Sequence, residues 1–443
     1  MSDNKITMDM INDYNQEFDS DINNQLLMNA IIKNGIQNVC FDYTSDINMQ
    51  HNFSIDIKSG DITAQKKSGR CWLFAGLNIV RWHIMKKLNL KTFELSQTYQ
   101  MFFDKFEKAN YFLESILKTL DEETDSRLID HLLKAPVEDG GQWDMFYNTV
   151  EKYGVVPKAM MPESFESSNT QKMNWLLTLR LRKDACILRE AHASKTTTTD
   201  LEEMKKGMLK DIYFILVKSL GKPPVKFDFE YRDKDDRFFR DTDLTPLSFY
   251  DKYVGELLDD YVSLISAPTL DKPFMKSYTV SFLGNVIDKP VKYLNVEVEA
   301  LKQVAIAQLQ DGEPVWFGCD VGKWLGETGA MDLDQFHYSE AFKTEFEMSK
   351  AQRLDYKESM MTHAMVFLGV NLKDGKANRW KVENSWGDER GNKGYYIMSD
   401  DWFSEYLYQI VVPKKYLTAE MLEAYRDEPI VLKPWDPMGS LAK

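Results

Sequence analysis

A cysteine placed where an amphipathic helix begins is the feature that most constrains this chain. Cys71 precedes the run 72–88, in which apolar residues recur with a helical period. Their positions are Leu73, Leu77, Val80, Ile84 and Leu88. Unpaired N–H groups and the positive end of the helix dipole favour a thiolate at a helix N-terminus. The pattern therefore predicts a nucleophilic thiol whose pKa lies below the usual value of about 8.5.

Three further residues supply what a cysteine nucleophile needs. Gln65 lies six residues before Cys71, and its amide and the Cys71 backbone N–H can stabilise an oxyanion. His363 opens an apolar strand, and Asn384 ends a second strand after the turn-like 373–378. Antiparallel strands joined this way place imidazole and amide side by side, as a base and the group that orients it. His337, in 335–338, is the other late histidine and is the alternative for this role.

The order of these motifs resembles that of a known family. Gln65 before Cys71–Trp72, His363–Ala364 and Asn384–Ser385–Trp386–Gly387 resemble the papain-like cysteine peptidases, within them the bleomycin hydrolase and aminopeptidase C branch. The resemblance implies an α+β, papain-like two-lobed fold, with a helical lobe and a β-barrel-like lobe. It also implies a large, mainly helical insertion, a C-terminal arm, and hydrolysis without any metal or organic cofactor.

The same resemblance assigns substrate-binding residues. The paired glycines Gly140 and Gly141 would lie beside the substrate backbone, although a simple turn is the alternative interpretation. Trp386 would shield the hydrogen bond between the histidine and the asparagine from water. Ala442 and Lys443 would end an arm in the cleft, where a terminal carboxylate fixes the α-ammonium of a peptide. Relatives can trim a terminal residue, so persistence of Lys443 stays open.

The 292 residues that separate Cys71 from His363 exceed the roughly 130 to 150 of papain-type chains, so an insertion must divide the site. We expect five segments: 1–60, an N-terminal helical arm and lead-in; 61–160, the helical lobe; 161–295, an inserted helical and hairpin region with oligomer contacts; 296–412, the β-rich lobe; and 413–443, the C-terminal arm.

Local patterns predict individual elements within these segments. Expected helices are 72–88, 96–109, 111–120, 143–153, 171–193, 201–220 with Asp200 as N-cap, 296–310 and 345–357. Expected strands are 226–232, 314–319, 364–370, 380–383, 394–397 and 408–412. Two prolines exclude a regular helix from 433–443, which is expected to be extended and anchored by Trp435.

The cysteines indicate a reducing compartment. Cys40, Cys71, Cys186 and Cys319 are widely spaced and suggest neither a disulfide framework nor a zinc site. Secreted papains carry a disulfide-forming cysteine just before the nucleophile, where this chain has Ser68, Gly69 and Arg70. The sequence also shows no signal-peptide pattern and no membrane-span pattern. A cytoplasmic, soluble protein is therefore expected.

The net charge of −14 bears on partners. Nucleic-acid binding needs a basic footprint, and although some members of the resembling family bind DNA, the local candidates fit solvated surface better. These are Lys66, Lys67 and Arg70, and Arg180, Arg182, Lys183 and Arg189. Expected partners are peptides and further copies of the chain, a hexamer by resemblance, with no membrane and no tight nucleic-acid binding.

The expected function is that of a cytosolic cysteine aminopeptidase of the bleomycin hydrolase type. An endopeptidase of the same family, with the arm outside the cleft, is one alternative. A non-catalytic papain-fold scaffold or nucleic-acid binder is another. Side-chain preference and physiological substrate are not fixed by the sequence.

Overall fold

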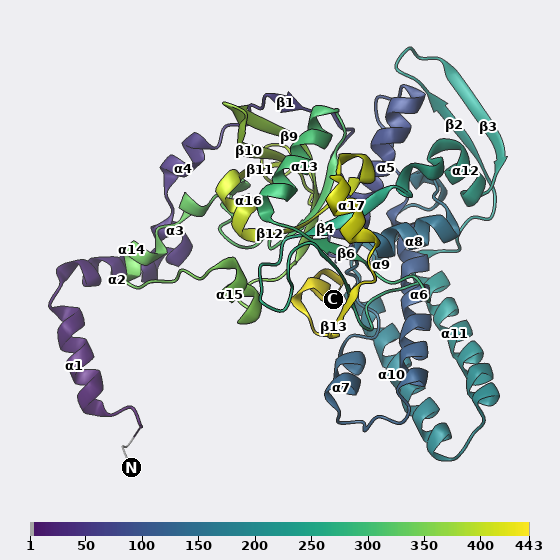
Figure 1. Ribbon diagram of the computed structural model, residues 1–443, viewed down its shortest axis with the longest axis horizontal. Coiled ribbons are helices and arrows are strands. Elements are labelled where there is room, and N and C mark those ends of the chain that lie inside the picture. The colour runs from purple at the N-terminus through teal and green to yellow at the C-terminus, as the bar shows by residue number, and fades with distance from the viewer. Residues whose placement is uncertain (1–3, 443) are drawn as a thin grey trace.

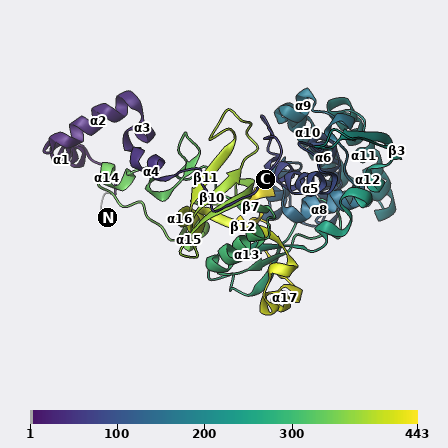
Figure 2. The same ribbon diagram turned by 90° about the horizontal axis from the view of Figure 1, so that it is seen from above.

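A computed structural model describes residues 4–442. Helices gather on one side of the molecule, a large twisted sheet forms its middle, and the first helices project on the other side (Figures 1 and 2). The fold is therefore α+β, and the predicted arrangement of a helical lobe beside a β-rich lobe is confirmed.

The helical lobe is built around α5 (Cys71–Leu88). Its first turns are buried on every side, because α5 lies between the other helices and the sheet strands β9 and β7. The surrounding helices are α6 (Gln97–Lys118), α7 (Arg127–Lys134), α8 (Trp143–Tyr153), α9 (Phe165–Ser168), α10 (Gln171–Ala193), α11 (Thr198–Leu220) and α12 (Pro246–Tyr253).

The main sheet has eleven strands within the described residues and runs in the order β13-β5-β6-β4-β12-β7-β9-β10-β11-β8, with β1 beside β9. Their bounds are β1 (Ile55–Asp56), β4 (Tyr261–Ile265), β5 (Lys276–Val280), β6 (Tyr293–Asn295), β7 (Val315–Cys319), β8 (Ala330–Met331), β9 (His363–Lys373), β10 (Lys376–Glu383), β11 (Tyr395–Ser399), β12 (Leu407–Pro413) and β13 (Ile430–Leu432). The central strands β7 and β12 are buried along their whole length, so they lack the alternation of apolar and exposed polar residues, and the buried Gln409 side chain of β12 donates to Ser263.

Several predicted elements are confirmed. The structure gives α8 and α10 the predicted bounds, and β9, β10, β11 and β12 each lengthen a predicted strand by one to several residues. The predicted strand at 226–232 is β2 (Phe227–Arg232), which pairs with β3 (Phe238–Leu244) as a separate hairpin. The helix predicted at 296–310 is α13 (Val298–Gln310).

Other predictions are wrong in detail. The helices predicted at 96–109 and 111–120 are the single helix α6, because no glycine or proline interrupts a segment that packs along α8, α10 and α11. Asp200 is not the N-cap of α11; the Thr197 side chain takes this role by accepting from the Asp200 N–H. The helix predicted at 345–357 shrinks to α15 (Lys350–Asp355), capped by Ser349.

The β-rich part begins earlier than the expected boundary at residue 296. Strands β4, β5 and β6 belong to the main sheet, and β4 pairs directly with β12. The β4 strand is buried along its whole length and therefore lacks the alternation that marks a half-exposed strand. The excess length of the chain thus consists of helices and the β2–β3 hairpin, followed by strands of the main sheet.

The N-terminal end is helical as expected, whereas the C-terminal end differs from the expected extended arm. The N-terminal end forms α1 (Met8–Asp19), α2 (Ile22–Asn34), α3 (Ile36–Cys40) and α4 (Tyr43–Asn48). The C-terminal end forms α17 (Ala419–Arg426), then β13, then a 3-10 helix, η5 (Pro437–Ala442), where an extended segment was expected. Proline is compatible with the first position of a helical turn, so Pro437 can begin η5. Across residues 4–442 we find no helix with the length and apolar character needed to cross a bilayer.

Candidate active site

Cys71 begins α5 and lies against the first residues of β9. The preceding Arg70 has a non-helical backbone, and the backbone N–H groups of Ala364 and Trp72 act to lower the pKa of the Cys71 thiol. The Cys71 side chain is almost wholly enclosed, with 4% of its surface exposed. Since Ala364 follows His363, the fold brings the predicted nucleophile to the predicted histidine from 292 residues away.

Burial decides the charge state of this thiol. It raises the pKa of Cys71 to about 11, although the hydrogen bonds from Ala364, Trp72 and the Cys71 N–H act in the opposite direction. The expected depression of the pKa by the helix N-terminus is therefore wrong for the closed cleft. The thiol is protonated in this state, and it must pass its proton to a base before it can attack.

His363 and Asn384 meet as predicted. His363 pairs with Cys319 of β7 at the start of β9, and its Nε2 lies 2.8 Å from the Oδ1 of Asn384, which follows β10. That oxygen also accepts the Ser385 backbone N–H at 2.7 Å, which fixes the orientation of the amide. Nε2 therefore carries the proton, and Nδ1 is the free basic nitrogen of the ring.

The imidazole is neutral in the enclosed site. Burial lowers the pKa of His363 to about 4, against the opposing hydrogen bond with Asn384. The ring of Trp386 lies 4.8 Å from the His363 ring, centroid to centroid, tilted by 39°. The Cys71 thiol and the His363 imidazole are thus both neutral in this state, and the Trp386 ring packs against the His363 ring.

Gln65 connects the nucleophile loop to the asparagine loop. Its Nε2 donates to the Ser68 carbonyl at 2.6 Å, and its Oε1 accepts the Ser385 hydroxyl at 2.7 Å. Its backbone N–H also donates to the Ser385 carbonyl at 2.8 Å. The second N–H of the amide stays available for an oxyanion. All four predicted catalytic residues are therefore buried together where the two lobes meet.

The glycine pair packs against the residue after the nucleophile. A Cβ on Gly141 would lie 2.5 Å from the indole of Trp72, so only glycine fits there. The Trp72 Nε1–H donates to the Asp139 carbonyl at 2.7 Å, and the Gly140 carbonyl accepts the Lys108 ammonium at 2.5 Å. These contacts explain the two glycines by packing alone. Contact of Gly140 and Gly141 with substrate remains a proposal.

The C-terminal segment contacts residues next to the glycine pair and near His363. The Met438 carbonyl accepts from Gln142 Nε2 and from Tyr293 Oη, both at 3.2 Å. The Ser440 hydroxyl donates to the Met361 carbonyl at 2.9 Å, two residues before His363. Arg127 stacks on the predicted anchor Trp435 at 3.8 Å from the ring centroid. Ala442 is partly buried against the core, and Lys443 lies outside the described residues.

Sequence reasoning missed the charged residues that support the site. Arg70 was interpreted as solvated surface, yet it is fully buried and paired with Glu163. Glu383, next to Asn384, is buried against Arg81 and Asn78 of α5. Polar residues within the apolar run 72–88 were the available signal for such a network, because a buried polar group needs a partner.

Comparisons with known proteins agree with this geometry. The model of the Peptidase C1-like family matches residues 5–439. Aminopeptidase C of Listeria monocytogenes is 50% identical over 441 residues, covering 99% of both chains. Bleomycin hydrolase of Gallus gallus is 44% identical over 392 residues, 86% of each. The crystal structure of PepW from Lactobacillus rhamnosis HN001 matches with a TM-score of 0.97 and 48% identity, covering 99% of both chains.

The fold and the buried cysteine, histidine and asparagine define a papain-like cysteine peptidase. Within that class, the chain belongs to the Peptidase C1-like family, in the branch of aminopeptidase C and bleomycin hydrolase. It is a cysteine aminopeptidase.

Proposed function

We propose that this aminopeptidase uses Cys71 as nucleophile, His363 as proton carrier, Asn384 to orient the imidazole, and Gln65 with the Cys71 N–H as oxyanion donors. The observation that carries the proposal is the hydrogen bond of 2.8 Å from His363 Nε2 to Asn384 Oδ1, which leaves Nδ1 as the basic nitrogen of the ring. Residues from both ends of the chain meet in one enclosed site.

The chemistry follows from these positions. Nδ1 of His363 takes the thiol proton while the sulfur attacks the scissile carbonyl carbon, and the carbonyl oxygen becomes an oxyanion. The carbon–nitrogen bond then breaks, and the imidazolium gives its proton to the departing amine. Water attacks the resulting thioester as His363 accepts its proton, and the acid product leaves with the free thiol restored. Cys71 and His363 are both buried and neutral before substrate binds. Substrate entry changes the surroundings of the thiol and is therefore part of the activation.

The C-terminal segment supplies the restriction to N-terminal residues in this proposal. Its contacts with Gln142 and Met361 bracket the cleft, which counts against the endopeptidase alternative with the arm outside. A carboxylate at the end of the arm would attract the α-ammonium of a peptide, and the arm would block longer chains. Gly140, Gly141, Trp386, Ala442 and Lys443 are the proposed substrate contacts.

A pair of substrates tests this restriction. The intact enzyme should hydrolyse an amino acid amide with a free amine and leave its N-acetylated counterpart uncut. Deleting residues 441–443 should reduce the first activity and create the second on N-blocked peptides. If the shortened enzyme gains nothing on N-blocked peptides, the arm does not set the specificity, although the cysteine chemistry would stand.

We also propose that the chain assembles with copies of itself, as a homohexamer. Neither α1 nor α2 has a buried residue, and their large apolar side chains face outward. The exposed set is Met8, Met10, Ile11, Tyr14, Phe18, Ile22, Leu26, Met28 and Ile32. Apolar surface of this extent marks a protein interface. Light scattering should give a multiple of the 51.6 kDa chain mass, and deleting residues 1–34 should lower it.

A cytoplasmic location completes the proposal. All four cysteines are free, although three of them are buried and protected. Free thiols are the expected state in a reducing compartment. The two groups of basic residues weighed for nucleic acid are largely engaged within the chain, since Arg182 and Arg189 donate to backbone carbonyls and Arg180 pairs with Asp184 and Asp211. Peptides are therefore the proposed substrates and partners.

A further inference from the structure

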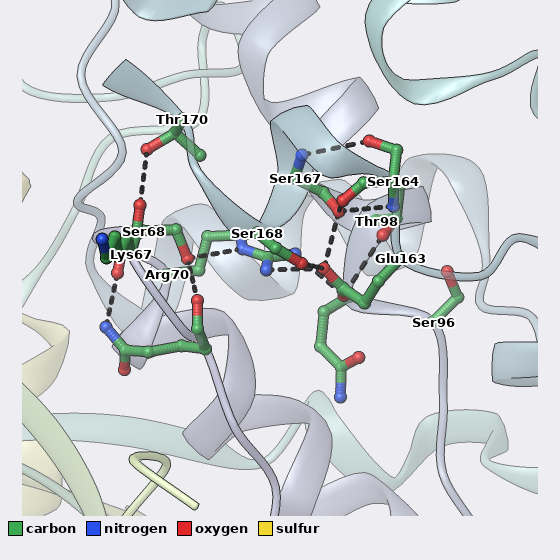
Figure 3. Close-up of polar contacts among 12 residues, drawn as sticks. Lys67, Ser68, Arg70, Ser96, Thr98, Glu163, Ser164, Ser167, Ser168 and Thr170 are labelled. Carbon is green, nitrogen blue, oxygen red and sulfur yellow. Dashed lines mark hydrogen bonds and ion pairs between the residues drawn. The ribbon is translucent and has the colours of Figure 1, made fainter. Parts of the chain in front are cut away.

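Arg70, the residue before the nucleophile, holds a carboxylate from a distant segment. Its side chain is 0% exposed. Its two terminal nitrogens donate to Glu163, Nη1 to Oε1 at 3.1 Å and Nη2 to Oε2 at 2.8 Å (Figure 3). Its Nε donates to the Ser68 hydroxyl at 2.9 Å. The guanidinium therefore donates in two directions: Nη1 and Nη2 donate to Glu163, and Nε donates to the loop that carries Arg70.

Ser68 passes this constraint to Gln65. The Ser68 hydroxyl donates to the Gln65 carbonyl at 2.6 Å, and Gln65 Nε2 donates to the Ser68 carbonyl at 2.6 Å. Main chain and side chain of Gln65 are thus both tied to Ser68. Between them, Lys66 has a φ of +53°, in the left-handed region that non-glycine residues rarely adopt. A loop with such a backbone keeps its shape only when its surroundings fix it.

Glu163 is anchored independently of Arg70. Its carboxylate accepts hydroxyl groups from Thr98 of α6 and from Ser167 and Ser168 of α9 (Figure 3). Burial acts to raise the pKa of Glu163, but the hydrogen bonds and charge of Arg70 outweigh it and hold the pKa below its usual value. The carboxylate is therefore charged, and it belongs to the rigid helical lobe rather than to the loop.

Stability alone does not explain this pair. Apolar side chains of similar volume are often as stabilising as a buried ion pair, because removing two charges from water is costly. What the pair adds is geometry, since a bidentate contact fixes both distance and orientation. Oxyanion donors act only when they are held close to their productive position.

We infer that Arg70 and Glu163 form a positioning pair that holds the Gln65 amide in place for the oxyanion. Neither residue touches the substrate; both act through Ser68 and Gln65. The inference rests on the proposed role of Gln65 as an oxyanion donor.

A double-mutant cycle tests the inference. Glu163→Gln keeps the shape but removes the charge that orients Arg70. We expect kcat and kcat/KM to fall together by about 10-fold, with KM within about 2-fold, because the lost interaction acts in the transition state. In the Gln65→Ala background, the same change should lower kcat by less than about 2-fold, because nothing is left to position.

The alkylation rate of Cys71 separates a positioning role from a general structural defect. A structural defect would change this rate, whereas loss of oxyanion positioning would not. The variants are made in the Cys186→Ser background, because Cys186 is exposed and would react. The Cys71 thiolate attacks the methylene carbon of iodoacetamide and displaces iodide without forming an oxyanion, so Glu163→Gln should change the Cys71 alkylation rate by less than about 2-fold. Asp400→Asn is the matched control: Lys302 and Asp400 pair at 2.7 Å with side chains 8% and 23% exposed, against 0% and 22% for Arg70 and Glu163. It should leave kcat unchanged.

Three results would overturn the inference: an equal loss of kcat with and without Gln65, a parallel loss of alkylation, or a fully folded Glu163→Gln enzyme with normal kcat. Should Glu163→Gln fail to fold, Ser68→Ala removes the hydroxyl between Arg70 and Gln65, and the same coupling to Gln65→Ala is expected. If Gln65→Ala itself leaves kcat unchanged, the proposed oxyanion role of Gln65 fails, which is a separate outcome.

Discussion

The two halves of the active site are held by different means. His363 and Asn384 stand at the ends of β9 and β10, where the backbone hydrogen bonds of the sheet fix them. Gln65 and Cys71 belong to a loop and a helix start outside the strands, where buried charged side chains add to the packing of α5 on β9 and β7. A backbone ladder tolerates side-chain changes along its length, whereas a loop fixed by buried charges depends on a few side chains.

Asp139 further connects the loop that carries Gln65 and Cys71 to the helices around it. Its carboxylate accepts the Gly69 N–H at 2.9 Å and Asn174 Nδ2 at 2.8 Å, and it pairs with Lys105 at 2.7 Å. Burial would raise the pKa of Asp139, but Lys105 and these hydrogen bonds hold it well below its usual value. Together with Glu163, this residue fixes the loop from a second direction.

The sheet half also has a buried charged contact that reaches across to the other half. Glu383 ends β10 beside Asn384, and its carboxylate pairs with Arg81 at 2.9 Å and accepts Asn78 Nδ2 at 2.6 Å. Both partners lie on α5, the helix that Cys71 begins. The distance between nucleophile and orienting amide is therefore fixed by a direct link as well as by the packing of the lobes.

The largest effect should come from the loop half. Cys71→Ala should lower turnover of a free-amine fluorogenic amide by at least about 10⁴-fold, because no other group can form the thioester. The melting temperature should stay close to that of the intact enzyme. More than trace turnover would show that the two halves do not make one site.

Breaking the link between the halves should mainly cost stability. Glu383→Gln leaves the buried Arg81 charge uncompensated, and we expect a loss of about 3 kcal/mol in the free energy of unfolding, measured in urea. Glu203→Gln is the control, because Glu203 and Lys206 form an exposed pair whose loss should cost less than about 1 kcal/mol. Equal effects for the two variants would contradict the structural role of the link.

On the sheet half, Asn384→Ala should lower kcat by about 10²-fold, since the imidazole loses the acceptor that selects its tautomer. The fold should survive, because the β10–β11 pairing does not use this side chain. Circular dichroism checks the fold and the fluorogenic amide checks the rate. Normal kcat in a folded variant would mean that the backbone hydrogen bonds of β9 orient His363 without help from Asn384.

The smallest expected effect concerns the pKa of Cys71. Burial raises it to about 11, so deleting residues 441–443, which admits water to the cleft, should lower it. Each unit of decrease raises the thiolate fraction near pH 8 about tenfold. The pH dependence of iodoacetamide alkylation in the Cys186→Ser background measures the shift. An unchanged midpoint would show that the arm does not enclose the thiol.

The sequence predicts the contact of His363 with Asn384 and the long helices well, and for separate reasons. Cys71, His363 and Asn384 lie in short motifs that carry their chemistry, and α8 and α10 follow the helical period along their whole length. Contacts between distant segments are what sequence alone could not show. Glu163 lies 93 residues from Arg70, and neither has a neighbour that marks it as buried. The raised pKa of Cys71 likewise depends on packing from both lobes.

One consequence follows from fixing the nucleophile loop with Arg70 and Glu163 instead of a covalent bridge. The proposed mechanism needs the Cys71 sulfur in the thiol form, and all four cysteines are free. Dithiothreitol or glutathione, which would sever a stabilising bond in a bridged loop, can therefore regenerate an oxidised nucleophile here without loosening the oxyanion site. Reduction of an oxidised Cys71 sulfur therefore leaves the Arg70–Glu163 pair, and the loop that it holds, unchanged.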